Sequence, residues 1–136
     1  MNTISHHAAL VYVMVVVAAA DGQMNEPELK TIGELTRRLP VFRDFDHDRL
    51  ITLAQDCSSI LQEDDGLQAV LGLVRDALPE PLRETAYWLA LEVALTDHSV
   101  ALEEVRVIDT LRRALCIDRL VAVALERGAR ARYQVS

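Results

Sequence analysis

The 136 residues of this chain fit a single domain, so residues 1–136 are expected to fold as one unit. Hydrophobic residues make up 51% of the chain, which excludes a disordered protein, and the scarcity of aromatic residues (4%) predicts a core of Leu, Val and Ala. The net charge of −7 argues against nucleic acid as a partner, because phosphates repel an acidic domain.

The first predicted helix extends from about Thr3 to Ala20 and is apolar almost all round, as is typical of a helix at the centre of a bundle. Its apolar run is shorter than the roughly 20 residues that a membrane span needs, and the N-terminus lacks the features of a signal peptide. We therefore expect a cytoplasmic protein with no membrane span. Its valines would also suit a strand, but the later segment that matches it, Pro81 to Thr96, has a plainly helical composition.

The second helix is expected from Glu26 to about Leu39. Asn25 is a good N-cap, and Glu28 stands three residues later, which is the pattern of a capping box. Pro40 ends this helix. Five more helices follow, at about Asp46–Ile60, Asp64–Leu78, Pro81–Thr96, Leu102–Leu115, and from the cap Asp118 onward. Strand-like alternation persists nowhere, so the predicted fold class is all-α, a compact bundle of about seven helices.

The last helix carries a basic end, formed by Arg127, Arg130 and Arg132. Two explanations stay open for this cluster: a solvated helix end, or a contact with anionic lipid or another protein. The positions of this helix predicted to face inward are Leu120, Val121, Val123 and Leu125.

Other reactive side chains receive structural interpretations. Cys57 and Cys116 lack metal-type spacing and are expected to be buried small hydrophobes. His6 and His7 precede Asp21 by about 20 Å of helix, so a surface pair is expected there. A further acidic cluster has two explanations, either an N-cap with a solvated first turn or a peripheral ion site; its members are Asp44, Asp46, His47 and Asp48.

Two stretches of the chain repeat with an offset of 76 residues. Each has an apolar helix, an acidic loop and a second helix, so the sequence predicts two pseudo-symmetric helical hairpins, at about residues 5–39 and 81–115. The matched pairs are Tyr12 and Trp88, Val17 and Val93, Leu29 and Val105, Lys30 and Arg106, Ile32 and Ile108, Leu35 and Leu111, and Leu39 and Leu115.

The repeat places four carboxylates at matched positions, Asp21, Glu28, Asp97 and Glu104. One explanation is local, with each Asp accepting hydrogen bonds from the following turn and each Glu serving the next helix as a capping residue. The other is a divalent cation, since oxygen ligands from two loops suit Mg²⁺, Ca²⁺ or Mn²⁺, and His98 would favour Zn²⁺. The loops lack the EF-hand pattern.

An apolar helix followed by Asp21-Gly22-Gln23-Met24-Asn25-Glu26-Pro27-Glu28 resembles the TerB-like family of tellurite-resistance proteins, over about residues 5–128. The resemblance implies a compact helical domain of duplicated hairpins, with the acidic positions suspected of binding metal. It also implies a cytoplasmic stress response and protein partners, some in membrane-associated complexes. The second loop departs from the pattern, because His98 replaces Gly22 and Ala101 replaces Asn25. Similar domains in co-chaperones accompany a J-domain, whose His-Pro-Asp signature this chain lacks.

Two classes of function follow. The first is a non-catalytic stress-response module that binds a divalent metal and protein partners; an apolar helical domain is also compatible with a homodimer. The second is a metal-dependent enzyme that uses the acidic loop cluster. The first is favoured because the chain has no Gly-rich phosphate loop, no nucleophile elbow and no Glu-x-x-His motif.

Overall fold

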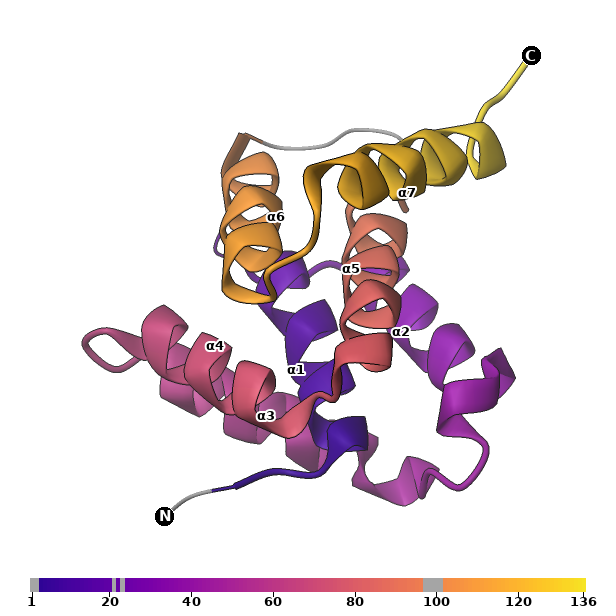
Figure 1. The fold of residues 1–136 in the computed structure, drawn as a ribbon. Helices are drawn as coiled ribbons and strands as arrows, with labels where there is room; N and C mark the ends of the chain where they lie inside the picture. The colour runs from indigo at the N-terminus through magenta and orange to yellow at the C-terminus, as the bar shows by residue number, and fades with distance from the viewer. Residues whose placement is uncertain (1–2, 21, 23, 97–101) are drawn as a thin grey trace.

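In a computed structural model, which describes residues 3–20, 22, 24–96 and 102–136, the chain is helical and these ranges contain no β-strand. Figure 1 shows the arrangement, which confirms the all-α prediction. The elements are α1 (His6–Ala18), α2 (Glu26–Arg38), the 3₁₀ turns η1 (Pro40–Phe42) and η2 (His47–Arg49), α3 (Leu50–Leu61), α4 (Gly66–Ala77), α5 (Glu80–Ala94), α6 (Leu102–Ala114) and α7 (Arg119–Arg132).

Helix α1 is the centre of the core. Every residue from Ala8 to Ala18 is buried, and α1 packs against α3, α4 and α5 as well as α2 and α6. Contact on all sides explains why a valine-rich segment forms a helix here: the burial of each apolar side chain outweighs the modest preference of valine for strands. None of the helices found in the described residues is long and apolar enough to cross a membrane.

The two predicted hairpins pack across one another. α2 contacts both α1 and α5, and α6 likewise contacts both α5 and α1. Figure 1 shows α1 and α5 side by side in the middle, with the α3–α4 pair on one flank and α2 on the other. α7 lies over the end of α5, and the C-terminus projects from it.

Several helices begin later than their sequence patterns predicted, because local hydrogen bonds decide the first turn. Ser5 caps α1 by accepting from the backbone amide of Ala8 at 3.0 Å. Asp46 accepts from the amide of Asp48 and begins a 3₁₀ turn, so its predicted capping role is confirmed but α3 starts only at Leu50. α4 starts at Gly66, directly after a left-handed residue.

Helix α7 corrects one prediction about the core. Leu120 and Val123 were expected to face inward, but they are 80% and 54% exposed. The buried positions are Ala122 and Ala129, and a Cβ added at Gly128 would lie 3.4 Å from the ring of Trp88. Small residues let the backbone of α7 approach α5 closely, so Leu120 and Val123 point outward, while Val121 and Leu125 are partly buried against the core as predicted.

Candidate functional site

Glu28 lies in the first turn of α2 and is 4% exposed. Its backbone amide donates to Asn25 Oδ1 at 2.9 Å, and the Asn25 amide donates to Glu28 Oε1 at 3.3 Å. These reciprocal bonds confirm the predicted capping box.

Glu104 occupies the matching place in the first turn of α6 and is 5% exposed. Its neighbour Glu103 is exposed, as is Glu26 in α2. In both helices, therefore, the carboxylate at the repeated position is buried, while an adjacent acidic residue in the same turn faces solvent. Burial therefore distinguishes Glu28 and Glu104 from the exposed acidic residues in the first turns of the same helices.

The loop end of each hairpin contacts the second helix of the other hairpin. The hydroxyls of Thr96, just beyond α5, and Thr31, one turn after Glu28, form a hydrogen bond of 3.0 Å. Gly22 of the first loop and Val107, one turn after Glu104, line the same cleft of about 450 Å³. The end of α5 thus meets α2, and the first loop meets α6.

Of the four predicted metal ligands, Glu28 and Glu104 are described, and Asp21 and Asp97 lie outside the described residues. Within the described ranges no group of three or more His, Cys, Asp or Glu side chains suits a metal ion. The four-carboxylate site stays a prediction. The described pair fits a hard divalent cation chemically, since carboxylate oxygens are the ligands that such cations prefer.

The sequence matches the family model for tellurite resistance protein TerB over residues 7–125. The chain belongs to the TerB family. No curated protein and no solved structure matches it. The match covers both hairpins, so the resemblance drawn from the acidic loops extends over nearly the whole TerB domain.

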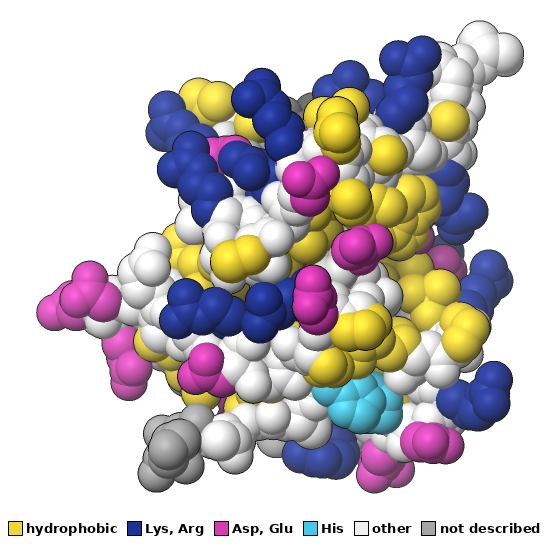
Figure 2. All heavy atoms as spheres, viewed as in Figure 1, with side chains coloured by type: hydrophobic (Ala, Val, Ile, Leu, Met, Phe, Trp, Pro, Cys, Tyr) yellow, Lys and Arg dark blue, Asp and Glu magenta, His cyan; other side chains and the backbone are white. Residues whose placement is uncertain are grey.

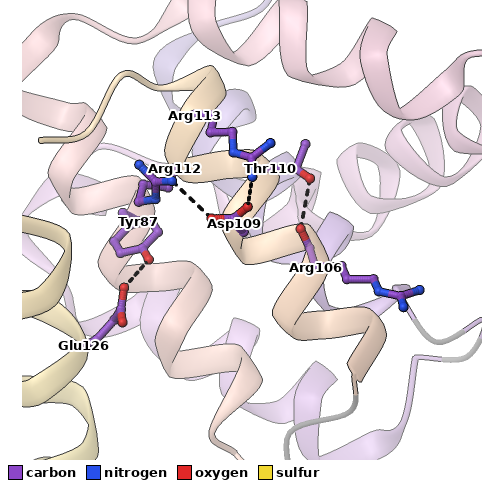
Figure 3. A network of polar contacts seen from close by, with 7 residues as sticks. All are labelled: Tyr87, Arg106, Asp109, Thr110, Arg112, Arg113 and Glu126. Carbon is purple, nitrogen blue, oxygen red and sulfur yellow. Dashed lines mark hydrogen bonds and ion pairs between the residues drawn. The ribbon is translucent and has the colours of Figure 1, made fainter. Parts of the chain in front are cut away.

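A second polar group in this TerB domain joins α5, α6 and α7 (Figure 3). The buried Tyr87 hydroxyl donates to Glu126 Oε2 at 2.7 Å, and Asp109 lies between Arg112 at 3.1 Å and Arg113 at 2.6 Å. Burial and the bond to Glu126 raise the pKa of Tyr87, which keeps the phenol a neutral donor. A cleft of about 270 Å³ opens beside the group, floored by Leu91, Ala94, Leu95, Val105 and Ile108.

Sequence reasoning missed one buried ion pair. Glu92 of α5 is 2% exposed, and Arg132 Nε of α7 lies 2.5 Å from its Oε1. The available signal was a single charged residue within the apolar run of residues 86–95. The partner is 40 residues away, so no local spacing would have identified it.

The cysteine prediction was half right. Cys57 is buried, as expected, but Cys116 is exposed. Cys116 follows α6 with a φ of 56°, and this left-handed turn directs the chain away from the helix.

The predicted surface histidine pair is also partly inside the fold. His7 Nε2 hydrogen-bonds to the Val41 carbonyl at 2.8 Å, and its ring stacks on Phe42.

Proposed function

We propose that this TerB-family protein is a non-catalytic stress-response module that binds a divalent cation and uses the bound form to recognise protein partners. The observation that carries the proposal is the burial of Glu28 and Glu104 at equivalent first-turn positions. Family membership supports a stress response related to tellurite resistance.

The proposed ligands are Asp21, Glu28, Asp97 and Glu104. Carboxylates that converge in one place repel one another unless a cation or a proton intervenes. A bound Mg²⁺, Ca²⁺, Mn²⁺ or Zn²⁺ would supply positive charge that fixes the two acidic loops relative to each other. The chain's own contribution is to hold two carboxylates out of solvent on rigid helix starts, with the capping box setting the position of Glu28.

An interaction role is favoured over the alternative of a metal-dependent enzyme. The chain lacks the sequence motifs of a nucleophile or a phosphate-binding loop. The tyrosine of the α5–α7 group is held as a hydrogen-bond donor to Glu126, which suits a structural tie between helices better than proton abstraction.

Affinity capture from the native host tests the proposal. The full chain is used as bait in buffer with divalent metal and in buffer with chelator. We expect specific proteins, including stress-response or membrane-complex components, to be recovered only with metal. The Glu28→Gln and Glu104→Gln baits should lose these proteins in both buffers.

The matched controls are Glu26→Gln and Glu103→Gln, which remove exposed carboxylates from the same two helix turns. These baits should behave as the unaltered protein does. Recovery of the same proteins with and without chelator would contradict the metal-dependent module. So would an equal loss of these proteins with the control baits. Turnover of a small molecule that disappears in Asp21→Asn or Asp97→Asn would favour the enzyme.

A further inference from the structure

Helix α7 is held to the rest of the protein on one side. Its main packing partner is α5, and its buried residues are the small side chains Ala122 and Ala129. Figure 1 shows α7 as the outermost helix at its end of the molecule. A helix with one main partner leaves much of its circumference in contact with solvent.

The charges of α7 are divided between these two sides. The helix contains four arginines and one glutamate in a chain whose net charge is −7. Glu126 is turned toward α5, where it accepts the hydrogen bond from Tyr87, and Arg132 is turned toward buried Glu92. The one carboxylate of the helix and one of its four arginines therefore contact α5. The other three arginines lie elsewhere on the helix.

These arginines share a face with the two exposed aliphatic residues. Arg119, Val123, Arg127 and Arg130 follow one another at spacings of four, four and three residues, and Leu120 lies seven residues before Arg127. Such spacings place side chains on one helix face. All five residues are exposed, and none of the arginines forms an ion pair with a described residue. We call this set the α7 face; Arg130 stands at its edge, where it borders the cleft beside Tyr87 together with Glu126, the one neighbouring carboxylate of the helix.

We propose that the α7 face docks on an anionic phospholipid surface. A helix whose outer side combines arginines with aliphatic residues lies in the plane of a bilayer, with the guanidinium groups at the phosphates and the aliphatic chains below them. The combination of guanidinium groups and aliphatic side chains on one side of the helix suits a surface that presents phosphates above an apolar layer. Figure 2 shows basic and apolar side chains, with a few acidic ones among them, over this end of the molecule.

The acidic character of the whole chain does not prevent this contact. At physiological ionic strength charges are screened over about 8 Å, so the residues that face the lipid determine the interaction. α7 is about 21 Å long at 1.5 Å per residue, and its acidic cap Asp118 lies at one end. The inference does not depend on the proposed cation site, which lies on other helices.

Vesicle sedimentation of the full chain tests the proposal. Vesicles of phosphatidylcholine are compared with vesicles that also contain phosphatidylglycerol, with chelator present throughout. We expect binding only to the anionic vesicles and a decrease as salt is added. Arg127→Gln should lower the partition coefficient about fivefold, and adding Arg130→Gln about fivefold more, because each surface arginine contributes about equally. Leu120→Ser should also weaken binding.

Matched controls separate this face from general surface charge. Arg37→Gln with Arg38→Gln removes two exposed arginines from α2, and Ile51→Ser removes a 71% exposed aliphatic side chain from α3. All of these positions are exposed, so the variants should keep the helical circular-dichroism spectrum, which is checked first. Absence of binding to anionic vesicles, or equal losses in the controls, would overturn the proposal. Binding to polyglutamate but not to vesicles would overturn it in favour of an acidic protein partner.

Discussion

Glu92 places a carboxylate among the apolar side chains of α5. Such a group is costly to bury unless it is paired, and the ion pair with Arg132 meets that need. The arginine is 58% exposed, so solvent screens the pair from one side and its net effect on stability is smaller than that of a fully buried pair. Its main consequence is positional, because it ties the end of α7 to α5.

The two cysteines differ in accessibility. Cys57 is fully buried in α3, and its thiol contacts the carbonyl of Tyr12 at 3.8 Å. Burial raises the pKa of Cys57 to about 12, so the reactive thiolate is scarce at neutral pH. Cys116 stands exposed after α6.

We predict that a disulfide reagent at slightly alkaline pH modifies Cys116 rapidly and leaves Cys57 intact until the protein is unfolded. Absorbance should therefore report one fast thiol in native buffer and two in guanidinium chloride. Cys116→Ser should abolish the fast phase, and Cys57→Ser should preserve it. Rapid reaction of both thiols in native buffer would show that the core around α3 opens readily.

Among the elements, the α3–α4 hairpin depends on a close backbone approach. A Cβ at Gly66 would overlap the carbonyl oxygen of Ile60, and Asp65 before it takes a left-handed φ of 57°. By contrast, a Cβ at Gly72, within α4, would meet no atom within 4 Å. The close backbone approach therefore requires a glycine at position 66, whereas the surroundings of Gly72 leave room for a larger side chain.

Gly66→Ala should destabilise the protein by about 2 kcal/mol, because the hairpin backbone must shift to admit the methyl group. Gly72→Ala should instead stabilise it by about 0.5–1 kcal/mol, since alanine is the better helix former. Urea denaturation followed by circular dichroism measures both. Equal effects of the same sign would show that the turn is not sterically closed.

The sequence predicted the order and type of the helices, because apolar periodicity and proline positions are local signals. The sequence-based predictions failed where packing between helices decides which side chains are buried, and where the local backbone decides at which residue a helix begins. Leu120 and Val123 are the more hydrophobic residues of α7, yet Ala122 and Ala129 face α5 because small side chains permit close packing. Helix starts were misplaced where a 3₁₀ turn or a left-handed residue intervenes, as before α3 and α4.

At the scale of the whole molecule, the crossing of the two hairpins brings distant parts of the chain into contact. The offset of 76 residues was enough to pair Glu28 with Glu104, and both are buried at helix starts. The sequence did not predict the contacts between the hairpins, such as Thr31 with Thr96, since these depend on how α2 packs on α5.

The central claim is that Asp21, Glu28, Asp97 and Glu104 bind one divalent cation. Its most direct test is the melting temperature of the full chain, measured in chelator and then in Mg²⁺, Ca²⁺, Mn²⁺ or Zn²⁺. A ligand that binds only the folded state at one hundred times its Kd stabilises it by about 2.7 kcal/mol, or about 10 °C for a domain of this size.

We predict such a rise for the unaltered protein and for the exposed controls Glu26→Gln and Glu103→Gln, and no rise for Asp21→Asn, Glu28→Gln or Glu104→Gln. Glutamine at position 28 keeps an oxygen for the capping box, so a lost response there reflects the cation and not the cap. An unchanged melting temperature with all four metals, or a rise that survives in Asp21→Asn, would contradict the account and leave capping as the role of these carboxylates.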